Sequence, residues 1–267
     1  MKFKFIQLCS ALILPITFII ILILLNTIPL PALNKYGFGG ILVATIALML
    51  TYVFVNKDGY TFKDISFYFE KKTPLRFVKG FVLGVVIATA MLAIVVSFSN
   101  LEISINKTID ITSLLIWVLA YFPLAYMEEV IFRGYAFTKI TNSVGIWPAQ
   151  ISLAILFAWY HDFTGLTFFQ QLLGPGIWAL LYGVVTLKSN GIALATGLHA
   201  ALNIIQALVG LKDYREGIWS LQYPQAINPE LQSQTETIGV ILQLCVLVVS
   251  IYLTEKYRRN RLKNECS

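Results

Sequence analysis

Long apolar runs separated by short polar segments dominate the pattern of this chain. The runs lie near residues 5–30, 38–55, 77–98, 111–137, 147–162, 166–187, 191–211 and 238–253. A helix needs about 20 predominantly apolar residues to cross the hydrocarbon core of a bilayer. The pattern therefore predicts an all-α, polytopic integral membrane helix bundle with about eight transmembrane helices, of which the fifth is the shortest.

The composition agrees with a lipid environment. Hydrophobic residues make up 57% of the 267 residues, charged residues only 13%, and the mean hydropathy is +0.74. Soluble domains carry about 25% charged residues. No internal repeat or separate polar domain interrupts the runs, so residues 1–267 are expected to form a single transmembrane domain. The first run is longer than the apolar core of a cleavable signal peptide and is expected to remain as a helix.

The positions of the positive charges predict an orientation. With a cytoplasmic N-terminus, eight spans place fourteen loop lysines and arginines inside and four outside, the outer ones being Lys35, Lys107, Lys212 and Arg215. Cytoplasmic loops carry such an excess. Both termini are therefore predicted to be cytoplasmic, and the small, lysine-rich chain suggests a bacterial plasma membrane. The net charge of +6 comes without a basic stripe, so we expect contacts with anionic lipid and no nucleic-acid partner.

Two connections stand out by their length. Segment 57–76 is charged and amphipathic, and it is consistent either with a helix on the inner membrane surface or with an ordinary connector. Segment 212–237 is the longest polar stretch and is expected to form an outer cap.

The fourth run carries paired carboxylates and an arginine. On a helix, Glu129 and Arg133 are four residues apart and share a face, so they can form an ion pair. Glu128 points about 100° away from Glu129 and is left to accept a proton. An ionisable residue at membrane depth marks a functional site by default. Taken alone, this segment is equally consistent with a helix end in water.

The two histidines of the chain lie in two further runs. His161 shares a helix face with Phe157, and His199 shares one with Asn203. A lone membrane histidine more often has a structural hydrogen-bonding role, and an asparagine can simply join two helices. Together, however, His199 and Asn203 can donate hydrogen bonds to a developing oxyanion. Small residues around His199 are expected to let another helix approach closely.

The depths of these groups agree with one another. In the eight-span topology Glu128, His161 and His199 lie about 15, 21 and 12 Å from the cytoplasmic ends of their helices, at 1.5 Å per residue. All three can meet in the cytoplasmic half or near the middle of a core about 30 Å thick. Independent structural residues have no reason to agree in depth, so the groups are expected to form one site.

The ordered motifs E-E-x-x-x-R, F-x-x-x-H and H-x-x-x-N, on separate membrane helices, resemble the CAAX-protease and bacteriocin-processing (CPBP, Abi) family of intramembrane endopeptidases. The matching residues run from Glu128 to Asn203 and place a protease core at about 111–211. The flanking segments agree only in being helices.

The resemblance implies roles for the motif residues. Glu128 and His161 would activate a water for attack on a peptide carbonyl, and His199 with Asn203 would steady the oxyanion. Glu129 and Arg133 would support the site. The family has also been described as metal-dependent, and Glu128, His161 and His199 could bind zinc with one open position. A glutamate mechanism without a metal is favoured, because asparagine is a poor zinc ligand and no H-E-x-x-H spacing occurs.

A second class of function remains open from the sequence. The same groups could serve a proton-coupled transporter or a peptide-binding bacteriocin immunity factor. A proton path tends to string its groups along the membrane normal, whereas hydrolysis needs them around one carbonyl. The expected partners are a peptide or protein substrate and membrane lipid. Prenylated proteins, peptide pheromones and bacteriocin peptides are all compatible as substrates, and no residue indicates an oligomeric state.

Overall fold

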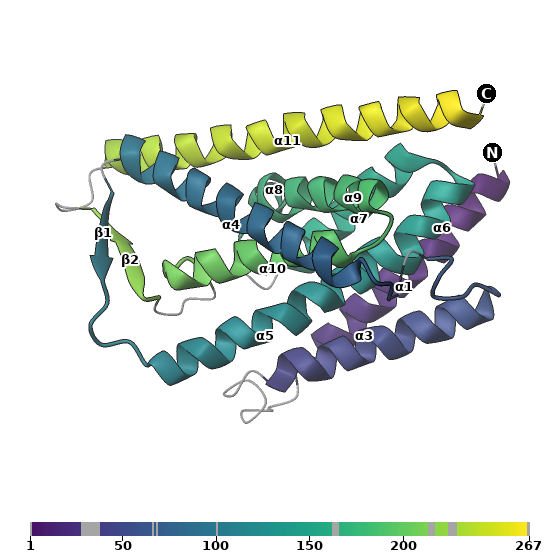
Figure 1. The fold of residues 1–267 in the computed structure, drawn as a ribbon, viewed down its shortest axis with the longest axis horizontal. Coiled ribbons are helices and arrows are strands. Elements are labelled where there is room, and N and C mark those ends of the chain that lie inside the picture. Colours follow the sequence, from purple (N-terminus) through teal and green to yellow (C-terminus); the bar gives the residue numbers. More distant parts are fainter. Residues whose placement is uncertain are drawn as a thin grey trace.

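A computed structural model describes residues 2–27, 38–65, 67, 69–99, 101–161, 166–212, 217–223 and 229–265. Leu30 and Asp162, at the ends of two predicted runs, and the loop cations Lys35 and Arg215 lie outside these residues. The described chain is a bundle of helices with one two-stranded sheet at one end (Figure 1). The predicted fold class is confirmed.

All eight predicted apolar runs contain helix. The helices before the site are α1 (Lys2–Asn26), α3 (Phe38–Lys57), α4 (Thr73–Phe98) and α5 (Ile111–Glu129). A π-helical segment, η1 (Val130–Tyr135), continues α5 into α6 (Ala136–Ser143), and α7 (Ile146–Tyr160) follows. The remaining helical elements are α8 (Phe168–Gln171), π-helical η3 (Leu172–Gly176), α9 (Ile177–Ser189), α10 (Ala193–Leu208) and α11 (Pro229–Glu265).

Six helical stretches of the described chain are long and apolar enough to cross a membrane: Lys4–Leu25, Gly39–Lys57, Thr73–Phe98, Ile111–Ser143, Phe168–Ser189 and Gln232–Asn264. Helices α7 and α10 are apolar but shorter. The fifth run, which contains α7, was expected to be short. The seventh run was predicted over 191–211, but its helix α10 begins after and ends before these bounds. Gly191 and Gly210 have φ angles of 154° and 69°, which do not continue a helix. The exact count of eight spans therefore stays a prediction.

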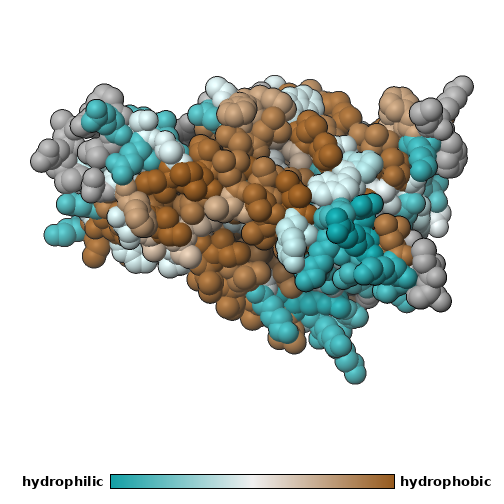
Figure 2. Space-filling model, turned by 90° about the horizontal axis from the view of Figure 1, so that it is seen from above, coloured by the Kyte–Doolittle hydropathy of each residue, from teal (hydrophilic) through white to brown (hydrophobic). Residues whose placement is uncertain are grey.

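Apolar side chains cover much of the outer surface. On α4, Val78, Val82 and Val86 recur every four residues, and each is more than half exposed. Figure 2 shows hydrophobic residues across the middle of one face and hydrophilic residues toward its two ends. A soluble protein rarely exposes so large an apolar area, and a lipid-facing bundle must. The protein is an integral membrane protein.

Helices α4 and α10 cross at unusually close range. A Cβ atom at Gly197 of α10 would lie 2.1 Å from the carbonyl oxygen of Phe77, and one at Gly80 of α4 would lie 2.0 Å from that of Leu194. Only glycine lets the two backbones approach so closely. The expected close approach at the small residues around His199 is confirmed, and α4 is the partner helix.

The strands lie at the end of the bundle opposite the two termini (Figure 1). Strand β1 (Glu102–Ile105) pairs antiparallel with β2 (Trp219–Gln222), with Ser104 opposite Ser220. The pairing joins the α4–α5 connection to the segment that was expected to form an outer cap. The sequence analysis did not predict it, because strand partners far apart in sequence leave no local signal.

The connection between α3 and α4 packs against the bundle. Ile65 is buried, and Tyr60, Phe62 and Phe67 pack against the same apolar core. The Asp58 carboxylate forms an ion pair with Lys139 and accepts a hydrogen bond from the hydroxyl of Tyr135 at 2.5 Å. The described part of this segment is thus a packed connector. Through Asp58 it contacts the end of η1 and the start of α6.

Candidate active site

The paired glutamates are the last two residues of α5, directly before the π-helical segment η1. Within η1 the backbone of Gly134 leaves helical geometry, with ψ at −115°, and a Cβ there would lie 3.9 Å from Cδ1 of Ile65. Such wide turns inside α-helices occur frequently at functional sites. The helix therefore changes its winding where Glu128 and Glu129 enter the core.

Glu129 is the centre of a buried polar cluster. Its Oε1 atom accepts a hydrogen bond from Nη1 of Arg133 at 3.4 Å and one from Nδ1 of His199 at 2.9 Å. Neither Glu129 nor Arg133 is more than 2% exposed. The structure thus brings together the expected pair and adds a contact to His199 that the sequence analysis did not foresee.

Glu128 lies on the other side of the same imidazole. Its Oε2 atom is 3.4 Å from Nε2 of His199 and makes no hydrogen bond within the described part of the chain. The imidazole of His199 therefore lies between two carboxylates, with Glu129 at Nδ1 and Glu128 at Nε2. This arrangement leaves lone pairs on Glu128 that can accept a proton.

His161 caps the C-terminal end of α7, and its tautomer is fixed by a local contact. Its Nδ1 atom lies 2.8 Å from the carbonyl oxygen of Phe157. A carbonyl can only accept, so Nδ1 carries the proton and, in the neutral ring, Nε2 is the basic nitrogen. His161 is also close enough to Glu128 and His199 to interact with both electrostatically.

Aromatic rings enclose the cluster. Tyr182 of α9 stacks on His199 with ring centroids 4.5 Å apart and planes 16° apart. Phe157 contacts both imidazoles, at 4.7 Å from His161 and 6.1 Å from His199, and its ring lies 4.4 Å from the Arg133 guanidinium carbon. Phe157 was part of a motif, whereas Tyr182 was missed because it stands in none.

Asn203 is buried one helical turn beyond His199 on α10. The tight α4–α10 crossing at Gly197 fixes how far this helix reaches into the bundle. All six predicted site residues thus lie in or beside the interior, on α5, η1, α10 and the end of α7.

A metal would need several ligands around one point. Among the described residues, no group of three or more His, Cys, Asp and Glu side chains is arranged to hold an ion. Nδ1 of each imidazole is used in a hydrogen bond to a carbonyl or carboxylate oxygen, which leaves Nε2 of each ring as the nitrogen that could bind a metal. Zinc held by Glu128, His161 and His199 stays the alternative to the favoured metal-free mechanism, and no step is derived through a metal.

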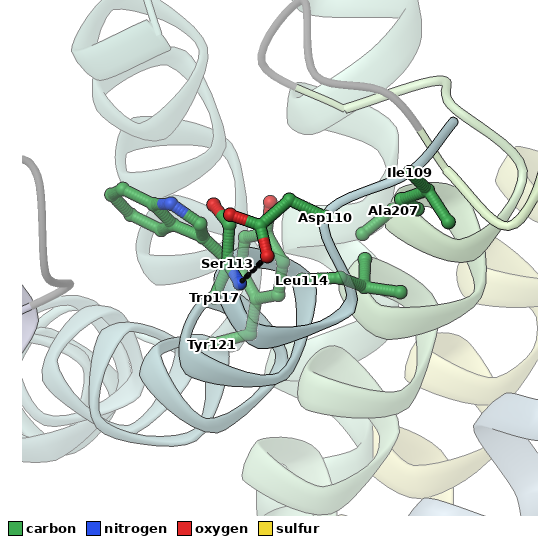
Figure 3. Close-up of a pocket in the computed structure, with 7 residues that line it drawn as sticks. All are labelled: Ile109, Asp110, Ser113, Leu114, Trp117, Tyr121 and Ala207. Atoms are coloured by element: carbon green, nitrogen blue, oxygen red, sulfur yellow. Dashed lines mark hydrogen bonds between the residues drawn. The ribbon is translucent and has the colours of Figure 1, made fainter.

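Two cavities lie in different parts of the helix bundle. A cavity of about 240 Å³ lies at the start of α5, where the Asp110 carboxylate accepts a hydrogen bond from the backbone N–H of Ser113 (Figure 3). Trp117, Tyr121 and Ala207 also line it, and none of the six site residues does. A larger cavity of about 680 Å³ lies between α4, α5 and α10.

A buried cluster of two glutamates, an arginine and His199, with the half-buried His161 beside it, lies inside an apolar helix bundle and defines an integral membrane protein with an intramembrane polar site. Residues 110–205 match the family model described as type II CAAX prenyl endopeptidase Rce1-like, and this segment contains all six predicted site residues. The match confirms the resemblance to the CAAX-protease and bacteriocin-processing family and supports a protease. No curated relative matches the chain.

Proposed function

We propose that the protein is an intramembrane endopeptidase that hydrolyses a peptide bond with a water activated by Glu128 and His161. The observation that carries the proposal is the meeting of three separate motifs in one buried cluster. His199 contacts Glu129 at 2.9 Å and Glu128 at 3.4 Å, and Phe157 contacts both imidazoles. Convergence around one point suits hydrolysis better than a proton path.

The first step removes a proton from water. Oε2 of Glu128 and Nε2 of His161 are the atoms that can accept it. The water oxygen then forms a bond to the peptide carbonyl carbon, and the carbonyl oxygen becomes a tetrahedral oxyanion. General base catalysis of this kind contributes about 10²–10⁴-fold.

The oxyanion is steadied by donors on α10. The side-chain amide of Asn203 is one. His199 is the second in its imidazolium form, because its Nδ1–H is already donated to Glu129 and only Nε2–H remains. When the C–N bond breaks, the proton taken from water passes to the leaving amine.

We also propose that the site opens toward the cytoplasm of a bacterial cell, with both termini on that side. The excess of positive loop charge at the predicted inner segments supports this orientation. Both ends of the chain lie at the same end of the bundle (Figure 1).

The test is peptide cleavage by purified protein in detergent, with Glu128→Gln, His161→Ala and the distant control Glu230→Gln beside the parent. A library of apolar and polar peptides is offered, with and without a chelator. Cleavage lost in both site variants, retained in the control and indifferent to the chelator is expected. Loss with the chelator and recovery with zinc would overturn the metal-free mechanism. No cleavage by a folded parent would favour a binding or transport role.

A further inference from the structure

We propose that one face of the two-stranded sheet binds the headgroup region of the lipid leaflet opposite the two termini. Strand β1 connects the end of α4 to the start of α5, and β2 pairs with it at that end of the bundle (Figure 1). This sheet face consists of four apolar side chains: Ile103, Ile105, Trp219 and Leu221. An apolar patch on the surface of a folded protein marks a protein or membrane interaction site.

The register of the pairing separates apolar from polar side chains. Ile103 is opposite Leu221, and Ile105 is opposite Trp219. Residues directly opposite each other share a face of the sheet, and so do residues two apart on one strand. The other face carries only polar side chains: Glu102, Ser104, Ser220 and Gln222. The sheet is therefore amphipathic.

The apolar face of this sheet is the one left uncovered. Ile105 is 69% exposed, Ile103 49% and Trp219 38%. On the polar face, Ser104 and Ser220 are half-buried, and their hydroxyls are hydrogen-bonded to each other at 2.7 Å. An antiparallel sheet of a soluble protein packs its apolar face on the core and turns its polar face to water. The sheet face needs an apolar environment that the bundle itself does not supply.

Lipid fits the position of this face. Phe98 at the end of α4 and Ile111 at the start of α5 are both more than 60% exposed, and both helices belong to membrane-length apolar stretches. Strand β1 joins these two helix ends, so the sheet face lies at the level where the helices leave the lipid. The face carries no charged side chain, and tryptophan, here Trp219, is enriched where a bilayer meets water.

The open edges of the sheet set its depth. Within the described residues the sheet has two strands, so backbone N–H and C=O groups along both outer edges lack a strand partner and need water. The hydrocarbon core of a bilayer contains no water, so the strands cannot enter it. Side chains of the sheet face reach the acyl boundary from the headgroup layer, as interfacial aromatic rings do.

Contacts to two long helices hold the sheet in place. The hydroxyl of Tyr223, directly after β2, donates a hydrogen bond to Thr235 of α11 at 2.7 Å. The side-chain amide of Gln234 on α11 donates to the carbonyl oxygen of Phe98 at 2.9 Å. The sheet, α4 and α11 are thus joined to one another, and the face is formed before lipid binds.

The test measures which quencher reaches each face of the sheet. Cys9, Cys245 and Cys266 are replaced by serine, and a fluorescent NBD group is attached at Ile105→Cys or, as the matched control on the other face of the same strand, at Glu102→Cys. The protein is placed in phosphatidylcholine nanodiscs. We expect a lipid with a nitroxide near its headgroup to quench the probe at position 105 about two-fold more strongly than aqueous iodide does, and the reverse at position 102.

Two other results would overturn the proposal. Stronger quenching by iodide at both positions would place the sheet face in water. A probe at position 105 that neither quencher reaches, but that becomes accessible when each nanodisc holds one copy of the protein, would assign the face to a second copy of the chain.

The native indole gives a measurement that needs no probe. The emission of the parent minus that of Trp219→Phe is the signal of Trp219. Lipid brominated near its headgroup should remove most of this difference signal, and lipid brominated near the end of its acyl chains should remove little. A difference signal that bromine does not change would overturn the proposal even if the labelled variants fail to fold.

Discussion

Oε1 of Glu129 lies 2.9 Å from Nδ1 of His199, and this contact joins the end of α5 to the middle of α10 inside the bundle. The same oxygen also accepts from Arg133. One carboxylate therefore orients the imidazole that lies beside Glu128 and is itself held by a guanidinium. The E-E-x-x-x-R motif on α5 and η1 and the H-x-x-x-N motif on α10 are thus joined by a direct hydrogen bond.

The buried Glu129–Arg133 pair should show strong coupling. Removing one member leaves the other charge buried and uncompensated, which costs about 3–5 kcal/mol. Glu129→Gln and Arg133→Met should each destabilise the protein strongly, and the double variant should lose clearly less than their sum. Unfolding in mixed micelles measures this cycle, with the pair Glu255–Arg259 as the control, where the arginine side chain is 71% exposed and little coupling is expected. Additive losses at the buried pair would contradict the interpretation.

Tyr182 should act through its ring rather than its hydroxyl. Its stack on His199 fixes the plane of the imidazole, and aromatic pairs of this kind are worth about 0.5–1.5 kcal/mol beyond their buried area. Tyr182→Phe should keep most of kcat, and Tyr182→Leu should lower it about ten-fold with a smaller effect on KM. The exposed ring of Tyr252 gives the control substitution Tyr252→Leu. Equal activity of the Phe and Leu variants would remove the positioning role.

Gly197 should not tolerate a methyl group. A Cβ there would lie 2.1 Å from a backbone oxygen of α4, so the two helices would have to move apart. Gly197→Ala should lower Tm by several degrees and reduce activity, because α10 also carries His199. Gly239 of α11 has open space around it, and Gly239→Ala should leave Tm unchanged or raise it slightly. Thermal unfolding of both variants tests this prediction. A Tm of Gly197→Ala equal to that of the parent would disprove the close crossing.

Asp58 should make the protein sensitive to acid. Burial acts to raise the pKa of its carboxyl, but hydrogen bonds from Lys139 and Tyr135 outweigh it and hold the pKa below the ordinary value of 3.8. A group with a lowered folded pKa stabilises the protein above its unfolded pKa, and the effect is lost as the pH falls through the folded value. The parent should exceed Asp58→Asn in Tm at pH 7, and the gap should close as the pH falls below about 3.8. A Tm difference that stays constant down to pH 3 would refute this linkage. In a Lys139→Met background, the Tm difference caused by Asp58→Asn should be smaller.

The sequence predicted what depends on local pattern. Apolar runs gave the helices, and the four-residue spacing gave the Glu129–Arg133 pair, because both follow from helix periodicity. The contact from His199 to Glu129 joins residues 70 positions apart and has no local signature. Tyr182 has none either, since an aromatic residue on an apolar helix is usually core. The pairing of β1 with β2 likewise depends on which two connections between helices the bundle brings together.

The chain bends between α5 and α6, because the backbone of Gly134 within Val130–Tyr135 is not helical. Before the bend, Glu128 and Glu129 lie in the buried interior. At the end of the segment and beyond it, Tyr135 and Lys139 reach Asp58. One stretch of chain therefore joins the polar cluster to the α3–α4 connection, and the angle of the bend sets how the two lie relative to each other.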